Sequence, residues 1–306
     1  MPQMNRPLVV GIGRAAINLV GVTPSLPENN RTVELSEVSV QVGGSACLAV
    51  GTSVAMGCAG RLSTRLADDF FAPFIRNALA AAGIDLRAVQ SEGLLTPFAF
   101  TAQSSSTSRR IGFTTEGDVA ALRASDLDTD ALLRGASALL VDGVFPEAQI
   151  AAGEAAKAAG IPVIFDGDRV SEGLGELIAL ADVVISSERL ASELAPTGEL
   201  QQALAEIQQM GPRAVILTMG EAGSIGVCED ELVEQSAFDT EKVDTSGAGY
   251  VFHGAFVTAL LNQLPFAQCM EFASAAASLS CEHRGTWAGI PTRSAVIELV
   301  RGSHVH

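Results

Sequence analysis

The chain has 306 residues, 48% of them hydrophobic, which is enough for one large α/β domain with a full core. Its 35 acidic and 19 basic residues give a formal net charge of −16. This balance argues against nucleic-acid binding, because phosphate backbones are bound by clusters of Lys and Arg. The five cysteines have no C-x-x-C spacing, which predicts reduced thiols rather than disulfides or a zinc site. Without a signal-peptide pattern or an apolar run of about 18 residues, we expect a cytoplasmic protein.

The first part of the chain predicts a buried strand and a separate small sheet. Residues 8–11 form a short apolar run that ends in glycine, as in a buried strand. Apolar and polar residues alternate over 32–42, 98–103 and 111–115, which is the period of half-exposed strands. We expect these three segments to build a small antiparallel lid, drawn from about 19–42 and 95–116, on a single domain that spans 1–306.

Helices and strands then alternate toward the carboxyl end. Early helices are expected over 46–56, where small residues favour close packing, and over 66–83, which has an apolar face. Strand-like runs follow at 138–141, 163–165, 183–185 and 214–217. Helical stretches are expected at 147–159, 171–180, 188–210, 247–263 and 266–282. Alternation of this kind predicts an α/β fold with a mostly parallel sheet covered by helices on both faces, a three-layer α/β/α body.

A glycine-rich loop follows the first strand. Gly11 to Ala16 reads G-I-G-R-A-A and matches the pattern G-x-G-x-x-A of dinucleotide-binding turns. That fingerprint should open a helix. Pro24 and Pro27 follow too closely for a regular helix, so the pattern gives only weak support to a nicotinamide-dependent oxidoreductase.

Two later loops predict a phosphate site. Thr218 ends a strand, and Gly220 and Gly223 follow where the backbone turns sharply or approaches a ligand, although a simple hairpin turn has the same pattern. Residues 244–250 read D-T-S-G-A-G-Y and introduce a helix near Gly247, with Thr245 or Ser246 as its cap. Small residues there expose N–H groups at the positive helix end, which is a ready anion site.

The 244–250 loop resembles the D-T-x-G-A-G-D signature of the ribokinase-like (PfkB) carbohydrate kinases. The segment 13–18, the glycine pair 43–44 with its following helix, and the 218–223 loop are similar to other motifs of that family, in the same order. The segments 166–168, 252–254 and 288–291 look nearest to the branch of sulfofructose and related ketose kinases. The resemblance covers almost the whole chain.

The resemblance implies a ribokinase-like body with a β lid, and an ATP-dependent sugar kinase that uses Mg²⁺ and transfers the γ-phosphoryl group to a hydroxyl. It implies catalytic positions at Gly247, Ala248, Gly249 and residue 250. Nucleotide contacts are expected from Thr218, Gly220, Gly223, Asp244, Thr245 and Ser187. Acceptor contacts are expected from Asn18, Gly43, Gly44, Arg110 and Asp166. Metal ligands are not assigned. We also expect a homodimer formed through the lid, whose 32–42 strand would otherwise present an exposed edge.

The sequence departs from the family at several of these positions. Tyr250 replaces the catalytic Asp, and a phenol with a pKa near 10 is mostly protonated at neutral pH, unlike a carboxyl near 4. Asn18 replaces an Asp, and Leu48 replaces an Asn that contacts the sugar. Ser187 and Leu190 replace the Asn and Glu of an N-x-x-E motif.

These departures leave three interpretations open. The chain is an impaired kinase, or it is a catalytically inactive protein that binds a sugar or a nucleotide. A change restricted to Tyr250 in a working enzyme also fits, because Phe252, His253 and Gly254 beside it keep the appearance of the branch. A packed helical role is expected for His253.

Overall fold

Two β-sheets of unequal size form the scaffold in the computed structural model, which describes residues 6–28, 30–91, 95–107, 109–194 and 199–303. The larger sheet has nine strands in the order β13-β12-β11-β10-β9-β8-β1-β4-β5. Its strands are β1 Leu8–Ile12, β4 Ala59–Ala67, β5 Ile84–Ser91, β8 Ala136–Val141, β9 Val163–Gly167, β10 Val183–Ser187, β11 Ala214–Thr218, β12 Ser224–Cys228 and β13 Glu231–Gln235. The strands from β11 to β5 are parallel to one another, and β12 and β13 join antiparallel at one edge.

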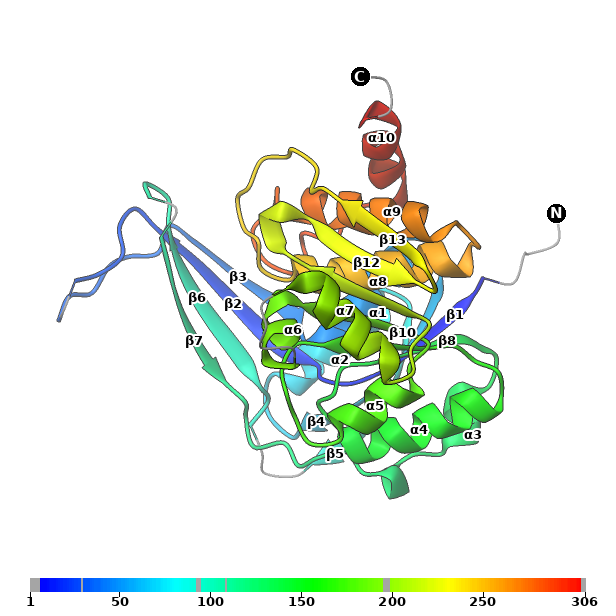
Figure 1. Cartoon of the computed structure of the whole chain (residues 1–306). Helices are drawn as coiled ribbons and strands as arrows, with labels where there is room; N and C mark the ends of the chain where they lie inside the picture. Colours follow the sequence, from blue (N-terminus) through cyan, green and yellow to red (C-terminus); the bar gives the residue numbers. More distant parts are fainter. Residues whose placement is uncertain (1–5, 29, 92–94, 108, 195–198, 304–306) are drawn as a thin grey trace, which may run out of the picture.

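Helices cover both faces of this sheet, as the alternating pattern predicts (Figure 1). One face carries α1 Ser45–Ala55, α2 Ala72–Ala81, α8 Ala248–Leu261, α9 Phe266–Ser280 and α10 Arg293–Ser303. The other face carries α3 Thr129–Leu133, α4 Pro146–Ala158, α5 Leu174–Leu180, α6 Glu188–Leu194 and α7 Leu200–Gln209. Successive strand residues point to opposite faces, so Ile164 joins the first core and Phe165 the second. The predicted three-layer α/β/α architecture is confirmed.

The smaller sheet stands off the body (Figure 1). Its order is β3-β2-β6-β7, with β2 Ala16–Thr23, β3 Glu37–Gly43, β6 Phe98–Ser104 and β7 Arg110–Thr115. The β2–β3 and β6–β7 pairs are antiparallel, and β2 and β6 pair in parallel. The expected strand at 32–42 is shorter than predicted, since residues 32–36 lie outside any strand and β3 begins at Glu37.

Several predicted elements differ in the structure. The helix expected at 66–83 begins only at Ala72, because β4 extends to Ala67 and pairs there with β5. Residues 188–210 form two helices rather than one. A strand, β2, follows the Gly11–Ala16 turn where a dinucleotide-binding loop would open a helix, so the dinucleotide interpretation is wrong. The sequence pattern also did not predict α10.

Two short 3₁₀ turns, η1 Ala124–Asp126 and η2 Gly220–Ala222, complete the elements of the described chain. All five cysteines are free thiols, as expected. Among the described residues, the helices are too short or too polar to cross a membrane.

Candidate functional site

Helices α1 and α8 lie side by side and run in the same direction. The Ser53 hydroxyl donates to the Gly254 carbonyl at 2.9 Å, and further along the chain Cys58 lies 3.7 Å from the Thr258 hydroxyl. Both amino-terminal ends therefore lie on the same side of the molecule, at the carboxyl ends of the parallel strands. Open parallel sheets bind ligands at this edge.

The amino-terminal end of α8 presents free backbone donors. Gly247 precedes the helix with a φ of 82°, a left-handed conformation that glycine adopts without strain. Among the described residues, the N–H groups of Gly249 and Tyr250 have no hydrogen-bond acceptor. These donors, at the positive end of the helix dipole, match the predicted anion site.

The predicted capping side chains do not cap this helix. Neither the Thr245 nor the Ser246 hydroxyl accepts a hydrogen bond from the first turn, so that prediction is wrong. The Asp244 carboxylate shapes the loop instead, because it accepts from the N–H groups of Ser246 and Gly285, each at 2.9 Å. Its side chain is 6% exposed, so the carboxylate is built into the loop and faces little solvent.

Arg110 extends from the lid to this same loop. Its guanidinium donates to the Ser246 hydroxyl at 3.0 Å and lies 3.7 Å from the Asp244 carboxylate. A second lid contact reaches the loop, where Gln103 donates to the Val243 carbonyl at 2.8 Å. Arg110 is on the lid hairpin, as predicted, but it contacts the loop before α8 and does not line the acceptor-side cavity described below.

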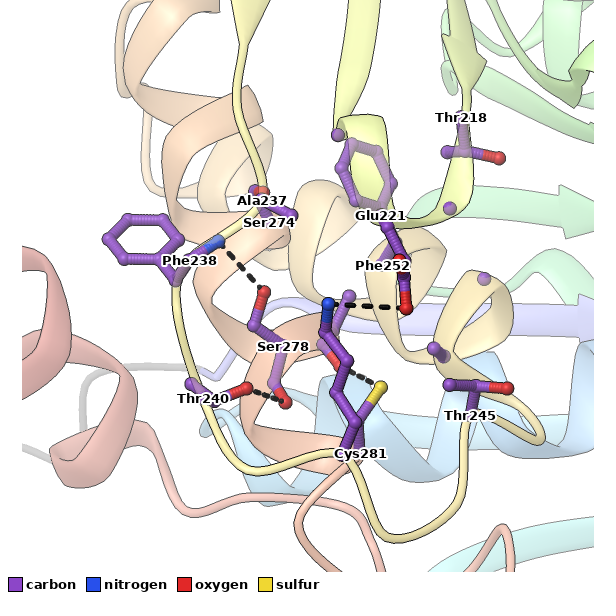
Figure 2. A pocket seen from close by; sticks show the side chains of 16 residues that line it. Thr218, Glu221, Ala237, Phe238, Thr240, Thr245, Phe252, Ser274, Ser278 and Cys281 are labelled. Atoms are coloured by element: carbon purple, nitrogen blue, oxygen red, sulfur yellow. Dashed lines mark hydrogen bonds and ion pairs between the residues drawn. The ribbon is translucent and has the colours of Figure 1, made fainter. Parts of the chain in front are cut away.

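A cavity of about 380 Å³ lies on one side of the α8 end. Figure 2 shows it between the β11–β12 turn, the loop after β13, and helices α8 and α9. Six of the predicted nucleotide and anion residues line it: Thr218, Gly220, Gly223, Thr245, Ala248 and Gly249. An ion pair of 3.3 Å between Lys242 and Glu221 joins the turn to the loop. Phe252 and Ala277 give the cavity an apolar wall of the kind that accepts a planar ring.

A larger cavity of about 940 Å³ lies on the other side, between the body and the lid. Tyr250 lines this larger cavity, whereas Gly249, the residue before it, lines the first cavity. Among the predicted acceptor residues, Asn18, Gly44 and Asp166 line this cavity, whereas Gly43 lies behind the Asn18 amide. The Asn18 amide donates to the Thr286 hydroxyl at 2.8 Å, and Leu48 is buried in the cavity wall.

The surroundings of Tyr250 keep its phenol protonated. Burial raises the pKa of Tyr250 well above its usual range, and the carboxylates of Asp166, Asp168 and Asp142 raise it further. The positive charge of Arg14 opposes this effect only partly. Tyr250 therefore offers a hydrogen-bond donor to the cavity at neutral pH rather than a base.

Asp142 is a carboxylate that the sequence did not single out. It follows β8 and holds the start of α1, accepting from the Ser45 hydroxyl at 2.5 Å and from the Ala46 N–H at 3.4 Å. It also accepts from the Arg14 N–H at 3.1 Å and from the Gln149 amide at 2.8 Å. Asp142 thus ties the loops after β1 and β8 to the first turn of α1.

Asp166 and His253 form a buried pair across β9 and α8. The two side chains approach to 3.1 Å, and each is 5% exposed. Burial raises the pKa of Asp166 to about 6, His253 lowers it, and Asp142 and Asp168 raise it. Next to this pair, Ser187 at the end of β10 donates to Asp168 at 3.4 Å and lines neither of the two cavities. Leu190 is fully buried.

The raised pKa of Asp166 predicts a defined pH dependence of stability. The folded carboxyl binds its proton more tightly than the unfolded one, whose pKa is 3.8. Its stabilising contribution is therefore complete below about pH 4 and is lost as the pH rises through about 6. The free energy of unfolding of the wild type, relative to Asp166→Asn, should fall by roughly 2 kcal/mol from pH 4 to pH 7. Urea titrations at pH 4, 5, 6 and 7 measure this difference, and a constant difference would contradict it.

Charged side chains at the outer part of the larger cavity were also missed. Glu116, just after β7, forms ion pairs with Arg14 at 2.5 Å and with Arg169 at 3.9 Å. All three residues line the cavity, and the contacts connect lid and body. Single charged residues in loops carry no periodic pattern, so nothing in the sequence distinguished them.

Comparisons with known proteins identify similar kinases. The profile of the pfkB family carbohydrate kinases matches residues 6–293. A ribokinase from Arabidopsis thaliana is 31% identical over 188 residues, which cover 58% of this chain and 49% of that protein. A nucleoside kinase from Methanothermobacter thermautotrophicus is 24% identical over 291 residues, 92% of each chain.

Solved structures show the same architecture. The structure of Arabidopsis thaliana ribokinase complexed with ribose and ATP is similar, with a TM-score of 0.81 and 25% sequence identity. The similarity covers 97% of this chain and 99% of that one. Because the family profile spans nearly all of the chain and the fold agrees over the same length, this protein belongs to the pfkB family of carbohydrate kinases.

Proposed function

We propose that this protein transfers the γ-phosphoryl group of ATP to a hydroxyl of a sugar or sugar-like substrate. One observation carries the proposal: Gly249 and Tyr250, neighbours in the first turn of α8, line different cavities. The free N–H groups at this helix end thus lie between a cavity suited to a nucleotide and a cavity suited to an acceptor. Such donors stabilise the charge on a phosphoryl group in transfer.

The smaller cavity is the proposed ATP site. Thr218, Gly220 and Gly223 line it from the β11–β12 turn, and the relative with similar fold was solved with ATP. Mg²⁺ enters with the nucleotide in this proposal, since it is usually held by phosphates and one or two carboxylates. Among the described residues no cluster of three or more potential ligands is preformed.

Tyr250 makes the proposed transfer slow. A general base contributes about 10²–10⁴-fold to a rate, and a buried phenol that keeps its proton does not supply one. The same observation favours a second candidate, a protein that binds a sugar and a nucleotide without turnover. The two candidates predict the same ligands and differ only in the rate.

Turnover measurements separate these candidates. ATP consumption with Mg²⁺ is measured for a panel of ketoses, aldoses, sugar acids and nucleosides, with binding of each compound measured in parallel. Ketoses stand first in the panel because Phe252, His253 and Gly254 resemble the ketose kinase branch. Turnover above the uncatalysed rate excludes the inactive candidate. A compound that binds without turnover, even at high enzyme concentration, excludes the kinase.

The outer face of the lid supports a proposed homodimer. The strand register places Val40, Leu19, Phe100 and Phe113 in one row across the sheet. Val38, Gly21, Ala102 and Ile111 form the next row on the same face. Val38 is 63% exposed and Phe113 is 60% exposed. An apolar sheet face of this kind is suited to the same face of a second copy.

A charge on this face is expected to separate the proposed dimer. Phe113→Asp should sediment as a monomer at concentrations where the wild type is a dimer, because an unpaired carboxylate is costly to bury. Phe70→Asp is the matched control, since Phe70 is 77% exposed and lies outside the lid. Sedimentation velocity measures both. A monomeric wild type, or a dimeric Phe113→Asp variant, would rule out this interface.

A further inference from the structure

His253 is surrounded by hydrogen-bond acceptors. Its Nδ1 lies 2.6 Å from the Gly249 carbonyl oxygen, one turn earlier in α8. Its Nε2 lies 3.2 Å from the Ile185 carbonyl oxygen of β10 and 3.1 Å from Asp166 Oδ1 of β9. Three elements thus converge on one buried imidazole.

These contacts determine the protons on the ring. A carbonyl oxygen only accepts, so each of these contacts is a hydrogen bond only where the ring nitrogen carries a proton, Nδ1 toward Gly249 and Nε2 toward Ile185. A neutral imidazole has one N–H and would leave a lone pair facing a carbonyl oxygen. The doubly protonated ring satisfies both carbonyls, and the Asp166 carboxylate then balances the buried positive charge.

The imidazole lies next to the anion site. Gly249, whose carbonyl accepts from His253, is also the residue that presents a free N–H at the amino-terminal end of α8. We propose that the Asp166–His253 pair is a positioning element of the phosphoryl-transfer site: it holds the first turn of α8 against β9 and β10 and places a buried positive charge behind the phosphates. This inference rests on the function proposed above. It assigns Asp166 a role through His253 instead of the direct acceptor contact that the resemblance implied.

The other charged groups around the pair are acidic. Asp142 after β8 and Asp168 after β9 raise the pKa of Asp166, and burial raises it more. Tyr250 of α8 faces the same three carboxylates. Arg14 is a second cation near this group, but its guanidinium pairs with Glu116, whereas His253 contacts Asp166 directly. Asp166 Oδ2 is buried without a hydrogen-bond partner among the described residues. His253 is therefore the main group that offsets the cost of burying the Asp166 carboxylate.

Nuclear magnetic resonance of the wild-type protein tests the charge state without any variant. The chain contains four histidines, and His283 is an exposed internal reference. The imidazole ¹⁵N shifts of His253 should be those of a doubly protonated ring at pH 7.5, a pH at which a model-peptide imidazole with a pKa near 6.5 is mostly neutral. The signal that disappears in the His253→Gln variant is assigned to His253. A neutral His253 ring at pH 7.5 would overturn the proposal.

Ligand binding tests the role in phosphate recognition. Gln keeps one N–H donor but removes the charge, so His253→Gln should weaken binding of the non-hydrolysable ATP analogue AMP-PNP about tenfold, the size expected for a charge near a helix end. Binding of adenosine, which lacks phosphates, should change less than about twofold by the same reasoning. Calorimetry with both ligands measures the contrast. Equal weakening of both ligands would indicate a purely structural role and would refute the proposal.

A double variant tests whether the two side chains act as one unit. Asp166→Asn should weaken AMP-PNP binding, because it removes the partner that maintains the charge on His253. The combined Asp166→Asn/His253→Gln protein should bind no more weakly than His253→Gln alone, whereas independent roles would make the losses add. If the wild type binds neither AMP-PNP nor adenosine, the proposed nucleotide function fails and the role behind the phosphates fails with it. The resonance experiment still decides the charge state in that case.

Discussion

Tyr250→Asp is expected to raise the rate constant for phosphoryl transfer by about 10²–10⁴-fold, the usual contribution of a general base. The backbone of the anion site is already present, with Gly247 in its left-handed conformation and the N–H groups of Gly249 and Tyr250 free. Residue 250 lines the acceptor cavity, so a carboxylate there would face the substrate hydroxyl. The smaller side chain also opens space between the two cavities. Steady-state turnover with a sugar that binds both proteins measures the gain.

Two matched variants separate the effect of the added carboxylate from the effect of the smaller side chain. Tyr250→Asn has nearly the same size as the Asp variant but has no basic carboxylate, so it should stay near the wild-type rate. Tyr250→Phe removes only the phenol hydroxyl and should change sugar binding more than the rate. If Asn accelerates transfer as much as Asp, steric blockage by the phenol limits the wild type. If neither accelerates it, the missing base is not what limits this protein.

Gly254→Ala is expected to lower the free energy of unfolding by about 3 kcal/mol, at the upper end of overpacking costs. A Cβ at this position would lie 2.2 Å from the Ala49 carbonyl oxygen and 2.6 Å from the Thr52 Cβ. Both atoms belong to α1, and a helix backbone does not yield as a flexible side chain does. The methyl group must therefore push α1 and α8 apart, at the contact that aligns their amino-terminal ends. Urea denaturation measures the loss.

The control for this variant is a helical glycine in open space. Gly175 of α5 is exposed, and a Cβ added there meets nothing within 4 Å. Gly175→Ala should be neutral or stabilise the protein by up to about 1 kcal/mol, because alanine has the higher helix propensity. A Gly254→Ala protein as stable as Gly175→Ala would show that the two helices separate at little cost.

The body of the fold follows from the sequence where local pattern and tertiary environment agree. The apolar runs of β8 to β11 are buried on both faces, and the helices between them have apolar stripes, so periodicity alone predicts this half. The prediction fails at 66–83. Leu66, where the helix was expected to begin, is buried in β4, because the strand continues to Ala67 along β5. Asp69 then starts the next helix by accepting from the N–H groups of Phe71 and Ala72.

The site was predictable to the extent that backbone chemistry defines it. Glycine at 247 and 249 and the turn at 218–223 indicate donors and sharp turns, and the structure places both around one cavity. The Asp166–His253 pair was not predictable, since it depends on how β9, β10 and α8 align in space. Asp142 was missed for the same reason: its partners come from the loop after β1 and from α1 and α4.

Because of Asp142, the amino-terminal ends of the parallel helices α1 and α8 differ in whether they can bind another anion. The amino terminus of α1 already holds an anion of the protein's own, because Asp142 accepts from Ser45 and Ala46 there. The neighbouring terminus of α8 keeps its N–H groups free. An incoming phosphate therefore meets one helix end that already binds a carboxylate and one helix end whose N–H groups are free. The contact between Gly254 and α1 holds the two helices side by side. In the proposed transfer, the fold itself selects which of two adjacent helix ends receives the phosphoryl group.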